Sequence, residues 1–123
     1  MAGFESKFSW CMVGHSGDAP RIPLVEFGAP PKTAADRLKV LLAMQAHAQY
    51  CMSGDHTVEA ARLAIKQVAE KEADDYFVFA FSDANFRRYG IDPHGFGALL
   101  TADPRCVFSY FYGRLYMISV IHF

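Results

Sequence analysis

The stretch of sequence that decides the fold class is YFVFAF, residues 76–81. Asp74-Asp75 precedes this apolar run and Ser82-Asp83 follows it, so the run has the length of a single strand. It does not alternate between apolar and polar residues, which is typical of a strand buried on both faces of a parallel sheet. We therefore expect residues 76–81 to form an interior strand.

Further strands and helices are predicted on either side of this run. Short apolar runs predict three more strands, at 9–13, 23–27 and 106–112, the first two as a hairpin. Apolar residues at helical spacing and a Pro at a first turn predict three helices, at 34–50, 58–72 and 93–100. The alternation of helix and strand predicts an α/β fold with a mainly parallel sheet.

The helix at 34–50 carries the clearest local signals in the chain. Thr33 stands where an N-cap is expected, since its hydroxyl can accept a hydrogen bond from the first turn. The apolar residues that recur at helical spacing are Leu38, Leu41, Leu42 and Ala46. In an amphipathic helix such a stripe faces the core, so we expect these side chains to be buried.

Bulk composition indicates one domain and excludes several kinds of protein. The chain has 123 residues, of which 52% are hydrophobic and 20% charged, and its formal net charge is −1. This charge gives no reason to expect binding to nucleic acid or to an anionic membrane. Three scattered cysteines without a C-x-x-C pair indicate a reducing compartment. No apolar run is long enough to span a bilayer and the first residues show no signal or transit pattern, so we expect a soluble intracellular protein.

Two oxygen-bearing side chains are expected at the carboxyl edge of the sheet, where ligands bind in open α/β folds. Thr57 lies where a loop becomes a helix, and Asp83 directly follows the strand at 76–81. A hydroxyl and a carboxylate are ligands of the kind that Mg²⁺ prefers, which makes these two residues candidate metal ligands. A helix-start role for Thr57 and a turn role for Asp83 are equally compatible with the spacing.

The histidines suggest a different function, a small metal-dependent hydrolase. The residues that could form its zinc or two-metal cluster are His15, Asp18, His47, Asp55 and His56. Their spacing matches no ligand signature, and turn formation and capping are the simpler roles for Asp18 and Asp55. The segment around His15 is also no nucleophile elbow, because Asp18 replaces the second glycine of G-x-S-x-G.

Three ordered segments resemble one family. They are VGHSGD at 13–18, AHAQYCMSGDHT at 46–57, and FSDAN at 81–85 followed by RYGI at 88–91. Together they are similar to the von Willebrand factor A domain found in a family of mitochondrial AAA-type ATPases. The resemblance runs from about Phe4 to about Phe111.

This resemblance implies a Rossmann-like fold with helices on both faces of a mainly parallel sheet. It also implies a metal ion-dependent adhesion site that binds a carboxylate of a partner protein through Mg²⁺. Of that site, Thr57 and Asp83 match the threonine and the aspartate of the family, whereas the D-x-S-x-S loop of its first strand occurs nowhere in the chain. Mg²⁺ is therefore expected in the complete domain and weakly or not at all in this chain. The resemblance also implies a mitochondrial location, but the chain has no G-x-x-x-x-G-K-[ST] loop for ATP.

The two ends of the chain depart from the family. Residues 1–112 are interpreted as a partial von Willebrand factor A domain that lacks its first strand and metal loop, and 113–123 as a divergent apolar tail that dangles or adds a strand. Because the missing strand is central in such a sheet, we expect 76–81 to have an unpaired edge that promotes self-association. The leading hypothesis is thus a fragment of a protein-binding domain without catalysis. The alternatives are the hydrolase and a truncated product without activity.

Overall fold

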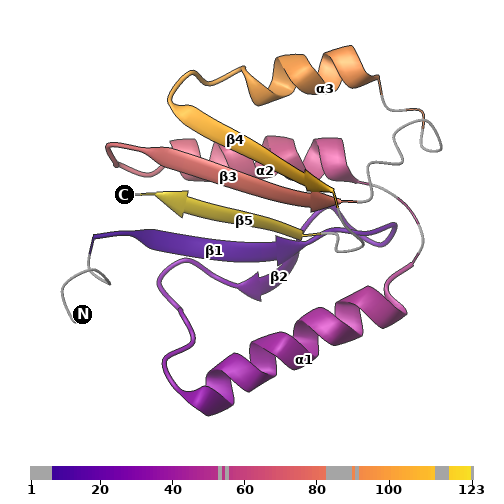
Figure 1. Cartoon of the computed structure of the whole chain (residues 1–123), viewed down its shortest axis with the longest axis vertical. Helices are drawn as coiled ribbons and strands as arrows, with labels where there is room; N and C mark the ends of the chain where they lie inside the picture. Colours follow the sequence, from indigo (N-terminus) through magenta and orange to yellow (C-terminus); the bar gives the residue numbers. More distant parts are fainter. Residues whose placement is uncertain are drawn as a thin grey trace.

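The computed structural model describes residues 7–52, 54, 56–82, 90, 92–112 and 117–122. Its elements, in chain order, are β1 (Ser9–Gly14), β2 (Ile22–Val25), α1 (Ala34–Tyr50), α2 (Thr57–Ala69), β3 (Tyr76–Ser82), α3 (Pro93–Leu100), β4 (Cys106–Tyr112) and β5 (Met117–His122). Figure 1 shows them along the chain. Every predicted helix and strand is present, and the α/β class is confirmed. None of the described helices is long and apolar enough to cross a membrane.

All five strands form one sheet in the order β2-β1-β5-β3-β4. β3 and β4 are parallel, as expected from their continuous apolar sequences, whereas β1 pairs with β2, and β5 with both β1 and β3, in antiparallel register. The hairpin of β1 and β2 is confirmed. The expectation of a mainly parallel sheet fits only the β3–β4 pair, because β5 lies between β1 and β3 and runs opposite to both.

β5 corrects the expectation of an unpaired edge on the strand at 76–81. Along Tyr76–Phe81, β3 pairs with β5 on one side and with β4 on the other, so neither edge of this strand is open. The apolar sequence MISVIH of β5 is strand-forming. The tail that was expected to dangle or to add a strand adds one, at the centre of the sheet (Figure 1).

α2 and α3 cover one face of the sheet. α2 buries Ala60, Ala61, Ala64, Ile65 and Val68, and the strands oppose them with Cys11, Val13, Tyr76, Val78 and Ala80. Phe96 of α3 meets Phe108 of β4 edge to face, with ring centroids 6.4 Å apart. On β3 the buried residues alternate with half-buried ones, so the other face of this strand carries Phe77, Phe79 and Phe81.

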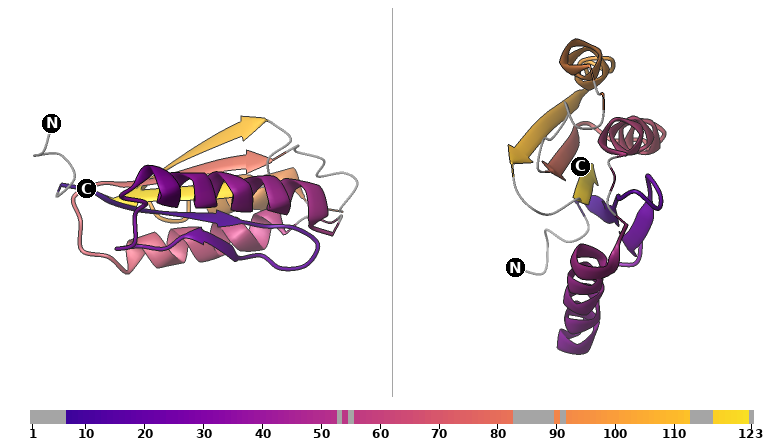
Figure 2. Two further views of the ribbon diagram at one scale, coloured as in Figure 1. Left: turned by 90° about the horizontal axis from the view of Figure 1, so that it is seen from below. Right: turned by 90° about the vertical axis from the view of Figure 1, so that its right-hand side faces the viewer.

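α1 lies apart from the other two helices, beside β2 (Figures 1 and 2). The expectation that its leucine stripe is buried is wrong: Leu38, Leu41 and Leu42 are 56%, 60% and 54% exposed. A different face of the helix is turned to β2, where Lys39 and Val40 line a groove together with Leu24 and Val25. The periodicity therefore predicts the helix correctly but not the side on which it packs.

The start of α1 is formed as the sequence predicts. The Thr33 hydroxyl oxygen accepts a hydrogen bond from the Asp36 backbone N–H at 3.1 Å, and the Asp36 carboxylate accepts one from the Thr33 N–H at 3.0 Å. This reciprocal arrangement is a capping box, which satisfies two backbone donors at the helix start. The hydrogen bonds from Thr33 lower the pKa of Asp36 below its usual value.

Candidate functional site

The carboxyl ends of β1 and β3 lie at the same edge of the sheet. Because β1 and β3 are both antiparallel to β5, they are parallel to one another and their carboxyl ends point the same way. Gly14 of β1 and Phe81 of β3 both pair with Met117, one on each side of β5. The loop at 15–18 and Ser82, the last residue of β3, therefore lie at the same level of the sheet.

The loop after β1 is a turn organised by Ser16 and Asp18. The Ser16 hydroxyl donates to Asp18 Oδ2 at 3.1 Å and accepts from the Asp18 N–H at 3.1 Å, while the Ser16 N–H donates to the Ala19 carbonyl at 3.0 Å. Ser16 is 1% exposed. The predicted turn role of Asp18 is confirmed, and its carboxylate orders the loop.

Three hydrogen bonds join this turn to the segment between α1 and α2. Asp18 Oδ2 accepts from the Met52 N–H at 2.7 Å, and the Met52 carbonyl accepts from the Gly17 N–H at 3.0 Å. His56 Nδ1 lies 2.5 Å from the Ser16 carbonyl oxygen. Since a carbonyl oxygen can only accept, Nδ1 of His56 is the donor of this bond. The first two resembling segments, far apart in the sequence, thus form one unit.

Close approaches at two glycines tighten this unit. A Cβ at Gly14 would lie 2.6 Å from Nε2 of His47, so only glycine lets the His47 ring rest on the end of β1. A Cβ at Gly54, where φ is +156°, would lie 2.5 Å from the Cα of Gly17. His47 is the buried residue of α1, and it fixes the carboxyl end of this otherwise exposed helix at the site.

Thr57 occupies the position predicted for it. It is the first residue of α2, it is fully buried, and its hydroxyl donates to the Ser82 hydroxyl at 3.3 Å. Ser82, the last residue of β3, is fully buried too and was not singled out from the sequence. Its position continues the alternation of buried residues along β3, which could have indicated it. Asp83 lies outside the described residues.

The oxygen atoms at this edge fit Mg²⁺ in kind but not in number. Thr57 and Ser82 offer hard hydroxyl oxygens, whereas Mg²⁺ requires an octahedral set completed by carboxylates and water. The described residues also contain no group of three or more His, Cys, Asp or Glu that could hold a metal ion, and Asp55 is not among them. The arrangement of His15, Asp18, His47 and His56 therefore does not support the hydrolase hypothesis.

Comparison with known proteins finds a relative over most of the chain. The chain is 48% identical, over 113 residues and 91% of its length, to the mouse (Mus musculus) von Willebrand factor A domain-containing protein 8. It spans 6% of the length of that protein. No protein-family model matches the chain. No solved structure matches it significantly.

Proposed function

Since this chain is a relative of one segment of von Willebrand factor A domain-containing protein 8, we propose that it is part of a protein-binding von Willebrand factor A domain. Its contact surface is the carboxyl edge of β1 and β3. A partner protein would bind there through oxygen ligands and a metal ion, without covalent chemistry. In the complete domain we propose a Rossmann-like sheet around this edge.

The observation that carries this proposal is the convergence of the resembling segments at one edge. The turn at 15–18 and the segment at 51–57 are joined by the hydrogen bonds of Asp18, Gly17 and His56, and Thr57 connects them to the end of β3. A fixed set of buried hydroxyls, with loops held around it, gives a preorganised edge for an approaching ligand. A loop that only connected α1 to α2 would not need these hydrogen bonds to the turn after β1 and to the end of β3.

The proposed cofactor is Mg²⁺, held by Thr57 and Asp83 together with a D-x-S-x-S loop from an upstream strand. When bound, the ion would offer an open coordination position to a carboxylate of the partner. Thr57 would supply a hydroxyl oxygen, and Ser82 would keep that hydroxyl in place. In the chain as it stands, too few ligands converge to offset dehydration of the ion, so binding should be very weak or absent.

We also propose that the chain has no catalysis of its own. It has no nucleotide-binding loop of the form G-x-x-x-x-G-K-[ST], and no described residues form a metal cluster suited to hydrolysis. ATPase activity and a mitochondrial location would belong to the longer protein that carries such a domain. Purified chain should therefore hydrolyse neither ATP nor a phosphate ester above the level of a His15→Ala/His47→Ala variant.

Titration calorimetry with Mg²⁺ tests the metal proposal. The chain itself should show no micromolar binding, whereas a longer chain that includes an upstream D-x-S-x-S segment should bind Mg²⁺. In that longer chain Asp83→Ala should abolish binding and Thr57→Ala should weaken it, while Asp103→Ala, which removes a partly exposed ion-pair carboxylate next to β4, should leave it unchanged. Micromolar binding by the short chain, or an unchanged affinity after Asp83→Ala, would contradict the proposed ligand set.

A further inference from the structure

The first half of β1 has one open side. β5 pairs with β1 along its whole length, from Ser9 to Gly14, whereas β2 pairs only with Met12, Val13 and Gly14. On the side of β2, residues 9–11 therefore have no strand neighbour among the described residues. Backbone N–H and C=O groups on an open strand edge are a template for pairing with another extended chain.

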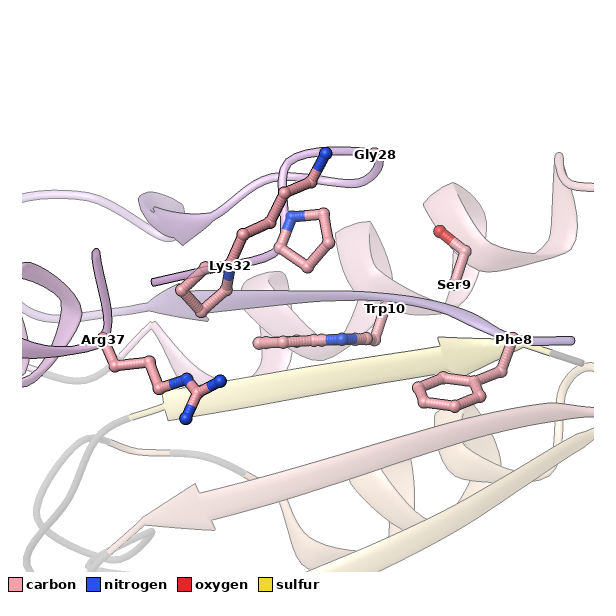
Figure 3. A pocket seen from close by; sticks show the side chains of 8 residues that line it. Phe8, Ser9, Trp10, Gly28, Lys32 and Arg37 are labelled. Carbon is pink, nitrogen blue, oxygen red and sulfur yellow. The ribbon is translucent and has the colours of Figure 1, made fainter. Parts of the chain in front are cut away.

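A cavity of about 680 Å³ lies along this open stretch. Its wall combines β1 with the connection that leads into α1, and it comprises Phe8, Ser9, Trp10, Gly28, Pro30, Pro31, Lys32 and Arg37. Figure 3 shows these side chains around the Trp10 indole. The volume is within the range of about 300–1,000 Å³ that is typical of ligand pockets. The cavity lies at the opposite end of β1 from the candidate functional site.

The described residues that line the cavity carry positive charge only. Among them the ionisable side chains are those of Lys32 and Arg37; both are exposed, and neither forms an ion pair within the described part of the chain. The described ion pairs instead join Arg21 to Glu26 and Arg105 to Asp103. Two such cations, with no carboxylate among the described lining residues, favour an anionic ligand.

The apolar part of the cavity is a flat aromatic surface. Trp10 is half-buried and shares a row of the sheet with Ile121 and Phe77, on the face turned away from the core. Pro30 and Pro31 line the same space from the other side and have no backbone N–H to satisfy. Trp10 is therefore placed to stack on a ring or an aliphatic side chain of a ligand, with Arg37 next to it (Figure 3).

We propose that this groove binds an extended acidic segment of a partner protein. The segment adds as a strand beside Ser9 and Trp10, places one apolar or aromatic side chain on Trp10, and pairs its carboxylates with Lys32 and Arg37. The strand edge favours a peptide over a small anion, because a peptide backbone offers both donors and acceptors to a strand and an anion offers acceptors only. This contact needs no metal ion, which separates it from the proposed function of the opposite edge.

The single tryptophan of the chain provides the measurement. A short capped peptide in which one Phe is flanked by Glu residues is titrated into the chain in the presence of EDTA, and Trp10 emission is recorded. We expect saturable binding that weakens with added salt. Lys32→Glu/Arg37→Glu should weaken it at least about tenfold, while the matched reversal Arg62→Glu/Lys66→Glu on the exposed side of α2 should leave it unchanged.

Two further peptides separate the possible outcomes. The same peptide with Lys in place of Glu should not bind, and a version with N-methylated backbone should lose about tenfold or more in affinity because it cannot pair as a strand. Equal affinity of the acidic and basic peptides, no binding up to millimolar peptide, or no effect of the charge reversal would overturn the proposal. Unchanged affinity of the N-methylated peptide, with competition by phenyl phosphate, would identify a small-anion pocket and would also overturn it. A lower circular dichroism signal of the Lys32→Glu/Arg37→Glu variant would indicate that the variant has lost folded structure. In that case the affinity of the milder variant Arg37→Gln is measured in its place.

Discussion

β5 and α1 differ in how well their sequences predict them and in how much of the fold depends on them. α1 has a capping box and a long helical repeat, and its bounds agree with the sequence prediction, yet its leucine stripe is exposed and β2 is its main neighbour. β5 has an apolar sequence that does not indicate its position in the sheet. It nevertheless lies in the middle of the sheet and pairs with β1 and β3 over their lengths. Local sequence signals therefore predict that an element forms, and they do not predict its importance to the fold.

The largest effect is expected from a break in β5. Ser119 pairs with Met12 on one side and with Phe79 on the other. Ser119→Pro removes a backbone N–H from a central strand and introduces a ring that clashes with its neighbours, so we expect a loss of about 3 kcal/mol or more of unfolding free energy. Urea denaturation measures this loss, with Ser119→Thr as the control that keeps the N–H. A cooperative transition unchanged by proline would show that the central pairing is not formed.

The second difference concerns the reactivity of two cysteines, one beside β5 and one at the end of α1. Burial raises the pKa of the Cys11 thiol to about 11. Cys11 pairs with Val120 in β5 and is fully buried, whereas Cys51 is the partly exposed C-cap of α1. In native protein at neutral pH, iodoacetamide should therefore modify Cys51 first, and Cys11 on the order of a hundredfold more slowly. Mass spectrometry of the labelled peptides measures both rates, and equal rates would mean that β5 opens readily.

The smallest effect is expected at the start of α1. Thr33→Ala removes the hydroxyl of the capping box and should cost about 1 kcal/mol of helix stability. Because α1 contributes little to the core, hydrogen exchange should increase in the first turn of α1 and remain unchanged in β3. Thr101→Ala, which removes an exposed hydroxyl at the end of α3, is a comparison at a helix terminus without a capping box. Faster exchange throughout the sheet would indicate that α1 is coupled to the core.

The sequence predicts the elements well because each has a local cause. The cap at Thr33, the proline at the start of α3 and the apolar run of β3 act within a few residues, and all three features are confirmed. Strand order and direction depend on which distant segments meet. A strand such as β5 carries the same apolar sequence whether it lies at the edge or in the centre, so its place could not be predicted from residues 117–122.

The candidate site was predictable only in part. Thr57 could be placed because a helix start after a loop is a local feature, and the turn role of Asp18 follows from its Ser-Gly-Asp context. The bond between Thr57 and Ser82, and the contact of His47 with Gly14, join segments that are remote in the sequence. The segments 13–18 and 46–57 both belong to the resemblance to one family, and hydrogen bonds of Asp18 and His56 join them in the structure.

The central position of β5 also determines the order in which the protein can fold. β1 with β2, and β3 with β4, can form as separate pairs, but β5, the strand that unites them, follows both pairs in the sequence, and Ser9 pairs with the distant His122. Such distant pairing slows folding. During synthesis the β1–β2 pair and the β3–β4 pair can form before β5 has been made. The edges of β1 and β3 that later pair with β5 are exposed during this time. Until β5 is made, those edges are open to other chains, and a chaperone that shields them would raise the yield of folded protein.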